Sequence, residues 1–490
     1  MRVLLINVGT KTEVRIPQGL LYLASAVELL GHEVTIYDEV FATDFHQSLQ
    51  RILDDDADII GLTVYSVPWQ LKRAEEISKA IKKAHQSTLV VWGGWHPTLY
   101  PKHSILNVNV DIIVRGAGEK PFSSLLNAFE KGQIPSEIPN LMFKHKNRII
   151  DTGTEYPGPE YLFPPLNFKF INLDAYLKKH DVRSGILQYV TTRGCYGRCA
   201  FCAMSHPSVR GCLVRKPKKQ IIKELQRLLL NHQINSIRFS DDNAFRNNTE
   251  ALELCEIANE ATRDKTIPWR CAARIDTLSR LPESTFEKLV VAGCEGLVIG
   301  IESGADRVLK LMKKDITKAQ IHKALNSMKK YGLTENLFFF LFDFPAESEK
   351  EALKSLKLAR KVRLAFPKAD IALSVYFPGY ARTDWLPKNV SSALASNLSE
   401  CFDDYYNKHI RNYRLAGVHV PILRYYFGAS KTKGKTGFAR RMYRKLILLR
   451  IKTGVFFIPF EYHIYNILIK WAKRFRRKNS KWNGQDLLEN

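Results

Sequence analysis

The 490-residue sequence lacks the features of several large protein classes. It contains no low-complexity run, and its first residues, MRVLLINVGT, do not follow the charged, apolar and small-residue order of a signal peptide. Its eight cysteines do not form an even disulfide framework, because three lie close together and five are scattered. We therefore expect a reduced, cytoplasmic protein. Its length of 490 residues predicts two to four domains.

Nucleotide-binding loops are also missing from residues 1–150, where short apolar runs alternate with helical stretches in five β/α units. This alternation predicts an α/β domain with a doubly wound, Rossmann-like parallel sheet. Ligands of such sheets bind in the loops after the strands, and none of these loops reads GxGxxG or a Walker A sequence. Gly93 and Gly94 in WGGWHPT would let another kind of ligand approach the backbone closely.

A second β/α series is predicted over residues 186–385, after a proline-rich linker at 151–185. Six repeats of strand and helix predict a partial (β/α)6 barrel, with its chemistry at the carboxyl ends of the strands. The predicted strands are 187–192, 235–240, 269–274, 295–302, 335–342 and 369–376. Examples of the predicted helices are 218–231, 250–262 and 319–331.

Three cysteines follow the first predicted barrel strand in the stretch TTRGCYGRCAFCAM. Cys195, Cys199 and Cys202 have CxxxCxxC spacing, one ligand short of a tetrahedral zinc site. His206 lies four residues further on, so a Cys3His zinc site is one interpretation. The other is a [4Fe–4S] cluster held by three thiolates, which leaves one iron open for a substrate.

This loop, at the start of six β/α units, resembles that of the radical S-adenosylmethionine (SAM) enzymes. In that family an aromatic residue usually precedes the third cysteine, as Phe201 does here. The resemblance implies that the cysteines hold a [4Fe–4S] cluster and that SAM chelates its open iron. It also implies reductive cleavage of SAM to a 5′-deoxyadenosyl radical, with electrons from a donor such as ferredoxin or flavodoxin.

The resemblance suggests further SAM contacts on later strands. Asp241 and Asp242 in FSDDNAF stand where the family binds the SAM amine, although a pair of helix-capping residues is the alternative interpretation. Arg274 in AARID is a candidate partner for the SAM carboxylate. Glu302 in IGIESG is a candidate for the ribose hydroxyls, since a buried glutamate is rare without such a partner.

The first domain resembles the cobalamin-binding domain of B12-dependent radical SAM enzymes. The resemblance places cobalamin against Gly93 and Gly94 in GGWHPTLYP, and against Gly116 and Glu119 in DIIVRGAGE. The DxHxxG loop that supplies a cobalt-ligating histidine is absent after the first strand. We interpret His46 in DFHQSL as a surface helix residue and name no cobalt ligand.

The sequence departs from the family pattern at three positions. The stretch FDFPAES stands where the family reads close to GxPGE, so Asp343 and Ala346 replace expected glycines. Ala117 stands where relatives often carry glutamate in RGEGE. These departures concern the adenine contact and one cobalamin loop.

The cofactor pair implies that a radical forms on an unactivated substrate carbon, which then receives a methyl group from methylcobalamin. Ring-forming members share the cofactors without transferring methyl, so a C-methyltransferase or a cyclase is expected. A radical SAM enzyme acting on a peptide or soluble natural product is an alternative. A non-catalytic cobalamin sensor or Fe–S scaffold is a third interpretation.

The C-terminal region, predicted to be helical over 386–490, carries much of the net charge of +25. From Pro421 to Asn490, 17 Lys and Arg stand against 3 Asp and Glu. The stretch FARRMYRKLILL sets an apolar series beside basic residues, and 463–478 repeats the pattern. The apolar series consists of Phe438, Met442, Leu446 and Leu449.

The basic helices of this region could contact either of two surfaces. Basic amphipathic helices suit the plane of an anionic membrane, which would make the protein peripheral at the inner face and its substrate lipid-like or isoprenoid. The alternative is that the apolar series packs on the barrel. Nucleic acid is not expected, because no recognised binding module accompanies the charge.

Overall fold

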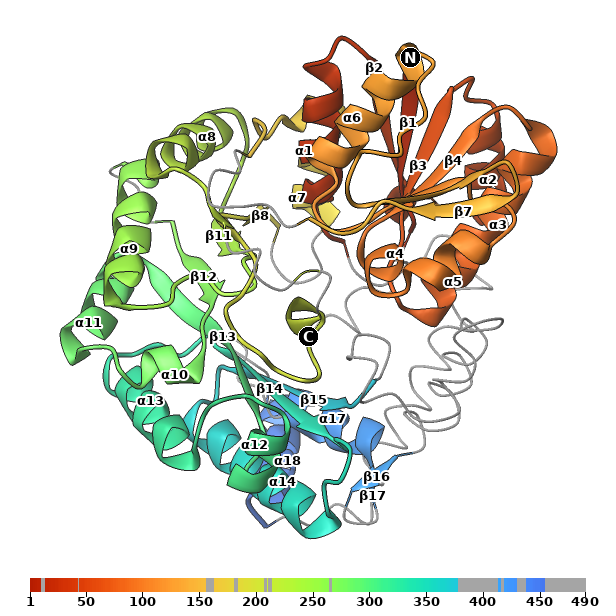
Figure 1. Cartoon of the computed structure of the whole chain (residues 1–490). Helices are drawn as coiled ribbons and strands as arrows, with labels where there is room; N and C mark the ends of the chain where they lie inside the picture. The colour runs from red at the N-terminus through yellow and green to blue at the C-terminus, as the bar shows by residue number, and fades with distance from the viewer. Residues whose placement is uncertain are drawn as a thin grey trace.

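The computed structural model describes residues 1–9, 14–42, 44–155, 163–179, 184–206, 209, 214–263, 267–377, 413–415, 418–429 and 438–453. Two α/β domains lie beside each other, with the first in red and orange and the second in green and cyan (Figure 1). Helices near the C-terminus pack on the second domain.

The first domain is built on a seven-stranded sheet with the order β2-β1-β3-β4-β5-β6-β7. Strands β1 to β5 pair in parallel, whereas β6 and β7 add an antiparallel hairpin at one edge. The strands are β1 Arg2–Asn7, β2 Glu33–Asp38, β3 Ile59–Thr63, β4 Leu89–Gly93, β5 Ile112–Val114, β6 Leu141–His145 and β7 Arg148–Asp151. The helices are α1 Gln18–Glu28, η1 Glu39–Phe41, α2 Phe45–Leu53, α3 Pro68–Ala84, α4 Trp95–Leu99, α5 Pro101–Leu106 and α6 Glu119–Glu130.

Both faces of this sheet are covered, because the central strands are apolar on both sides. In β1, Leu4 and Ile6 join the core beneath α2 and α3, while Val3 and Leu5 join the core beneath α1 and α6. This two-sided cover confirms the predicted doubly wound domain. His46 is exposed on α2, as predicted.

The second domain is a partial barrel with six parallel strands in the order β15-β14-β13-β12-β11-β8. All six predicted strands are present, with bounds that shift by up to three residues. The strands are β8 Ile186–Tyr189, β11 Ser236–Phe239, β12 Trp269–Ala272, β13 Cys294–Glu302, β14 Leu337–Phe342 and β15 Asp370–Val375. Their helices are α8 Lys218–Asn231, α9 Asn248–Thr262, α10 Ile275–Leu278, α11 Glu283–Val291, α12 Asp306–Leu311, α13 Lys318–Lys330 and α14 Glu349–Ala365.

The segment predicted as a linker contains short helical elements. A 3-10 turn, η2 Phe168–Phe170, is followed by α7 Leu173–Lys179. The Tyr176 hydroxyl of α7 donates a 2.5 Å hydrogen bond to Asp38, and Lys179 donates to the Val40 carbonyl at 2.7 Å. This segment therefore binds the first domain at the end of β2.

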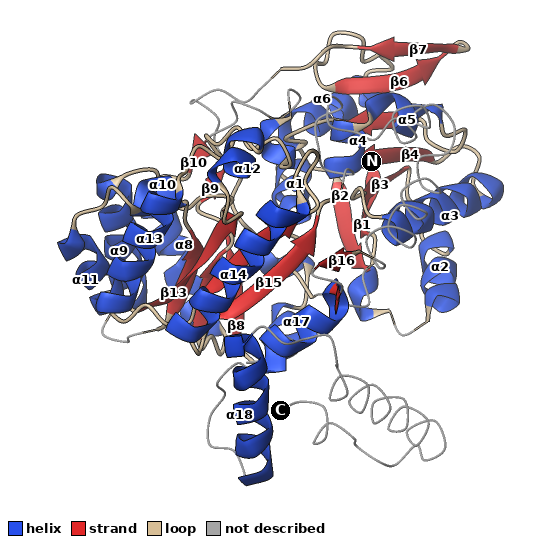
Figure 2. Cartoon of the chain, turned by 90° about the horizontal axis from the view of Figure 1, so that it is seen from below, coloured by secondary structure: helices blue, strands red, loops and turns tan. Residues whose placement is uncertain are grey.

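Two helices of the C-terminal region belong to the barrel side of the molecule. They are α17 Val420–Ala429 and α18 Phe438–Thr453, preceded by the hairpin of β16 Arg414–Leu415 and β17 Val418–His419. Helix α17 packs on β15, and α18 packs on α14 and α17 (Figure 2). The second predicted basic helix, 463–478, lies outside the described residues.

The face that α18 buries differs from the predicted one. Ile447 and Ile451 are fully buried, and the Arg360 side chain of α14 donates to the Ile451 carbonyl at 2.5 Å. Leu446 and Leu449, predicted to lie in one apolar stripe, are 36% and 54% exposed. Within the described part of the chain, no helix is long and apolar enough to cross a membrane.

A series of hydrogen-bonded polar groups in the first domain joins the segment after β3 to helices α4 and α5. His96 shares hydrogen bonds with Ser66 at 3.1 Å and with His103 at 3.0 Å. Burial lowers the pKa of both histidines, and that of His103 falls to about 4. Both rings are therefore neutral near pH 7, and one ring nitrogen donates to the other.

We expect this pair to make the fold acid-sensitive. An unfolded histidine has a pKa of about 6.5, so between about pH 6.5 and 4 the unfolded chain binds more protons than the folded chain. Stability is full above about pH 6.5 and falls by about 1.4 kcal/mol per pH unit per histidine as the pH drops through this window. His103→Gln should flatten the dependence of Tm on pH, and the exposed His46→Gln is the control. Identical curves for the two variants would contradict this expectation.

Candidate active site

The cysteine loop leaves the barrel just after β8 and the short strand β9 Thr192–Arg193. Cys199 is buried at 6% exposure, whereas Cys195 and Cys202 are partly buried. The Ser205 hydroxyl donates to the Cys199 carbonyl at 2.6 Å and contacts the Cys202 carbonyl at 2.9 Å. A guanidinium nitrogen of Arg274 lies 3.5 Å from Cys199 Sγ. The loop thus presents partly accessible thiols next to a fixed cation.

Burial favours the protonated form of the Cys195 and Cys202 thiols. It raises the pKa of Cys195, and it raises the pKa of Cys202 to about 12, with smaller contributions from neighbouring negative groups. Binding of a metal must therefore displace protons from the thiols. Among the described residues, no three His, Cys, Asp or Glu side chains converge on a point that a single ion could occupy.

The two aspartates after β11 Ser236–Phe239 have different surroundings. The Asp241 carboxylate accepts hydrogen bonds from Thr191 N at 2.7 Å, the Thr191 hydroxyl at 2.9 Å and Thr192 N at 2.5 Å. Asp241 therefore ties β11 to the start of the cysteine loop. Asp242 accepts a longer hydrogen bond from Gly194 N, at 3.3 Å, and it lines a cavity. The structure thus separates the predicted pair, and amine binding by either residue stays a prediction.

Arg274 and Glu302 meet in one buried network beside the cysteine loop. Arg274 binds Asp276 at 2.8 Å and the Lys314 carbonyl at 2.9 Å, and the Lys314 ammonium lies 3.0 Å from Glu302. Burial lowers the pKa of Lys314, but Glu302 and the Cys199 thiol outweigh that effect and raise it. The same ammonium lies 5.7 Å from the Phe201 ring, so this predicted aromatic residue also borders the network.

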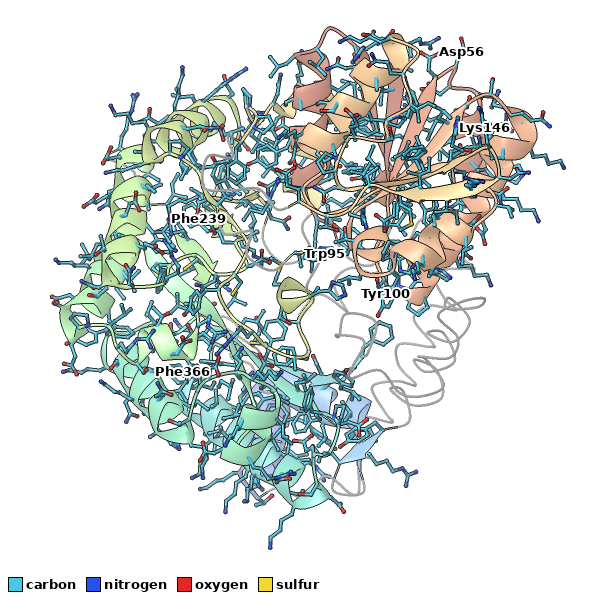
Figure 3. The ribbon with its side chains drawn as sticks, viewed as in Figure 1. Asp56, Trp95, Tyr100, Lys146, Phe239 and Phe366 are labelled. Carbon is cyan, nitrogen blue, oxygen red and sulfur yellow. The ribbon has the colours of Figure 1, made fainter. Side chains whose placement is uncertain are left out.

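A cavity of about 300 Å³ opens at the carboxyl end of the first sheet. The four residues predicted to contact cobalamin all line it: Gly93, Gly94, Gly116 and Glu119. A Cβ on Gly94 would lie 2.9 Å from Thr63 Oγ1 and 3.1 Å from the Val64 carbonyl oxygen, so the backbone there is closely packed. Figure 3 shows Trp95, another lining residue, at the edge of the first domain that faces the barrel.

The barrel completes the wall of this cavity. Arg193, Met204 and Asp242 belong to the cysteine loop or its supporting strands, and all three line the cavity. The remaining wall is largely apolar, with Leu20, Leu23 and Phe122 among its residues. One cavity therefore borders both the glycine loops of the first domain and the cysteine loop of the second.

Comparison with known families matches both halves of this site. Residues 1–126 match the B12 binding domain, and residues 189–359 match the radical SAM superfamily. The chain belongs to the cobalamin-dependent radical SAM enzymes. Its domains imply a [4Fe–4S] cluster, SAM and cobalamin as cofactors.

Relatives of this radical SAM enzyme cover most of its length. An uncharacterised methyltransferase of Pyrococcus horikoshii is 29% identical, over 78% of this chain and 79% of its own. The cytidylyl-2-hydroxyethylphosphonate methyltransferase of Streptomyces wedmorensis is 24% identical, over 66% and 68%. The structure of TsrM from Kitasatospora setae, with cobalamin and a [4Fe–4S] cluster bound, is similar in fold, with a TM-score of 0.60 and 17% identity over 76% of this chain and 75% of that one.

The residues present fit the implied cofactors of the radical SAM enzyme. The Gly94 backbone, with φ 90° and ψ −159°, adopts a conformation that only glycine takes readily, next to an open cavity. At Gly197 the restriction is steric rather than conformational, because a Cβ there would meet the Arg274 guanidinium. The first site lets a ligand in the cavity approach the backbone closely, and the second brings a cation against the thiols.

Two residues of this enzyme's site were not predicted from the sequence. Lys314 lies 12 residues after Glu302, in the segment that follows α12. In the sequence it is one lysine in the charged stretch LMKKDITK, and nothing there marks it as a site residue. Arg193 precedes Gly194 and Cys195 directly, so its position beside the motif could have marked it. Its partner Glu119 lies 74 residues away, and this separation hides the contact from sequence analysis.

The two residues that replace expected glycines keep a glycine-like backbone. Asp343 has φ 61° and Ala346 has φ 66°, both in the left-handed region. We expect Ala346→Gly to stabilise the enzyme by about 1 kcal/mol. Glycine relieves strain of about 1–2 kcal/mol at this φ, and the greater entropy of glycine in the unfolded chain offsets only a smaller part of that gain. Urea denaturation measures the change. Ala42→Gly, at φ −67°, is the control and should destabilise; stabilisation by both changes would contradict the argument.

Proposed function

We propose that this radical SAM enzyme is a C-methyltransferase for an unactivated carbon of a lipid-like or isoprenoid substrate. The observation that carries the chemistry is the single cavity shared by the predicted cobalamin loops and the cysteine loop. When bound, the cluster and SAM supply a radical that abstracts hydrogen, and cobalamin supplies the methyl group. Relatives named methyltransferases, at 29% and 24% identity, support methyl transfer, while relatives named magnesium-protoporphyrin IX monomethyl ester cyclase, at 22–25% identity, make ring formation the alternative.

The residues of this chain bind and orient the cofactors in this proposal. Cys195, Cys199 and Cys202 hold the cluster, while Arg274 lies against one of the thiols. Glu302, held by Lys314, is available to a ribose hydroxyl of SAM. A largely apolar cavity excludes water from a reactive carbon, which protects a radical from side reactions. Electrons are proposed to come from a ferredoxin or flavodoxin.

Cofactor content and product formation test the proposal. Enzyme purified and reconstituted without oxygen should hold about four iron atoms and one corrinoid per chain. It should form 5′-deoxyadenosine on addition of reductant and SAM. Loaded enzyme that forms no deoxyadenosine with substrate present would overturn the proposal.

A basic apolar face on α18 supports the lipid-like substrate class. Leu446 and Leu449 are exposed, and Lys445 and Lys452 are exposed near them on the same helix. Leucine and lysine side by side suit an anionic interface, where the apolar groups enter the acyl boundary and the ammonium groups meet phosphate. The buried Ile447 and Ile451 hold α18 on the barrel and leave this face outward.

Leu446→Glu/Leu449→Glu should weaken binding to vesicles of phosphatidylcholine and phosphatidylglycerol by about tenfold or more, since two leucines leave the interface and two like charges face anionic lipid. Flotation of vesicles with the full chain measures the bound fraction. Leu230→Glu, which alters a leucine on α8 that is 76% exposed, is the matched control. Equal flotation of both variants and the native chain would remove the membrane from the proposal.

A soluble small molecule is the second candidate substrate. The Streptomyces wedmorensis relative is named for a cytidylyl phosphonate, which is water-soluble, and that name favours this class. Lipid and polar metabolite profiles of a deletion strain distinguish the two. A missing methylated lipid supports the first candidate, and a missing methylated polar compound supports the second.

A further inference from the structure

One ion pair joins the two domains inside the wall of the shared cavity. The Arg193 guanidinium, from the barrel, donates to both carboxylate oxygens of Glu119, from α6, at 2.7 and 3.1 Å. The two side chains are 24% and 6% exposed, so water screens the pair only weakly. Two parallel charge-assisted hydrogen bonds fix direction as well as distance. The pair therefore constrains how the first domain meets the barrel at this point.

Arg193 is also covalently close to the cluster loop. It lies on β9, two residues before Cys195, and β9 is held by pairing with β10 Val214–Arg215. The next residue, Gly194, donates its amide to Asp242, which lines the same cavity. Arg193 and Cys195 therefore belong to one short stretch of backbone, which β10 and Asp242 hold in place.

Two aromatic rings also lie against the Arg193 guanidinium. Its central carbon lies 5.5 Å from the Tyr22 ring centroid and 5.1 Å from that of Phe163. Tyr22 belongs to α1 of the first domain, so the stacking repeats the interdomain contact. A planar guanidinium can stack and form a fork with a carboxylate at the same time, which an ammonium cannot do.

We propose that Arg193 is a positioning residue that couples the occupancy of the cobalamin cavity to the geometry of the cluster loop. The inference rests on the proposed function for the identity of the two cofactors. Glu119 lines the corrinoid side and Arg193 leads to the cluster side, so their fork contributes, beside the hydrogen bonds of Gln18 to Val190 and of Gln188 to Ile16, to the separation of the two cofactor sites. Separation matters because the radical and the methyl group must reach the same substrate carbon from fixed positions.

The test uses the full-length, reconstituted enzyme in four forms: Arg193→Met, Arg193→Lys, Glu119→Gln and Arg270→Met. Arg270 pairs with Glu295 at 2.7 Å with similar exposure, but it does not line the cavity, so it is the matched control. Two properties are measured: the Kd for hydroxocobalamin, by absorbance titration, and the cobalt-to-cluster distance distribution, by pulsed EPR of the reduced protein.

We expect the two Arg193 variants and Glu119→Gln to raise the Kd by about 10- to 100-fold, since a charged hydrogen-bonded pair is lost from the cavity wall. The same three variants should broaden the distance distribution. Arg193→Lys should not rescue it, because the fork and the stacking are both lost. Arg270→Met should match the native protein in both measurements.

An unchanged Kd and an unchanged distance distribution in Arg193→Met would overturn the inference while leaving the proposed function intact. Rescue of both properties by Arg193→Lys would also overturn it, since charge alone would then suffice. Native protein that binds no corrinoid would instead overturn the proposed function, and the inference with it. Should Arg193→Met not fold, Glu119→Gln, which keeps the shape of the side chain, decides the question.

Discussion

Cys199→Ala is expected to lose the cluster and all formation of 5′-deoxyadenosine. With one of three thiolates missing, an iron of the cluster has no protein ligand, and a cluster held by only two ligands is readily lost. Cys199 is also the cysteine that lies against Arg274, at 3.5 Å, so its removal leaves Arg274 with only Asp276 and the Lys314 carbonyl among these partners. We expect the iron content to fall from about four atoms per chain to near zero.

The control for this change is Cys255→Ala on α9. Cys255 has the same 6% exposure as Cys199, but it belongs to the hydrophobic core of the barrel. It should cost a small amount of stability and keep full iron content and activity. Iron content and deoxyadenosine yield are measured on both variants after anaerobic reconstitution. Native levels of both in Cys199→Ala would refute the role of the triad.

Gly94→Val is expected to weaken cobalamin binding by at least about 100-fold while leaving the cluster in place. Valine is strongly disfavoured at φ 90° and ψ −159°, and its Cβ would meet Thr63 and the Val64 backbone. The loop must therefore shift, and the shift takes place in the wall of the cavity. Because the cysteine loop is built on the barrel, its iron should stay at the native level.

Gly132→Val is the control that distinguishes a change in the cavity wall from the effect of backbone strain alone. Gly132 also has a positive φ, of 63°, but among the described residues nothing lies within 4 Å of the place that a Cβ would take there. That variant should lose stability and keep the native Kd for cobalamin. Titration with hydroxocobalamin and iron analysis report the two cofactors independently. Equal losses of affinity in both variants would mean that strain, rather than the cavity, explains the effect.

Much of the fold could be predicted because its signals are local. Each barrel strand is a short apolar run next to an amphipathic helix, as in the stretch from Phe239 through α9, so the order of elements follows from periodicity. The cysteine motif is equally local, with its three thiols within eight residues. The four predicted cobalamin contacts fall in loops at the carboxyl ends of strands, and parallel strands bring such loops to one edge.

Side-chain direction at the site was not predictable in the same way. Asp241 and Asp242 are adjacent and chemically identical, yet one is bonded to Thr191 and Thr192 while the other lines the cavity. On α18 the sequence offers more apolar residues than one face can hold. Contact with α14 and α17 decides that Ile447 is buried and Leu446 is not.

The sequence by itself predicted the two domains, the succession of their β/α units along the chain and the cysteine motif, because each depends on residues within a few turns of one another. The tertiary structure alone decided which groups meet across the domain boundary. The contact of Arg193 with Glu119 and that of Lys314 with Glu302 depend on how separate elements pack. Packing is a collective property of many side chains, so a pair that is distant in sequence carries no local signal of its contact.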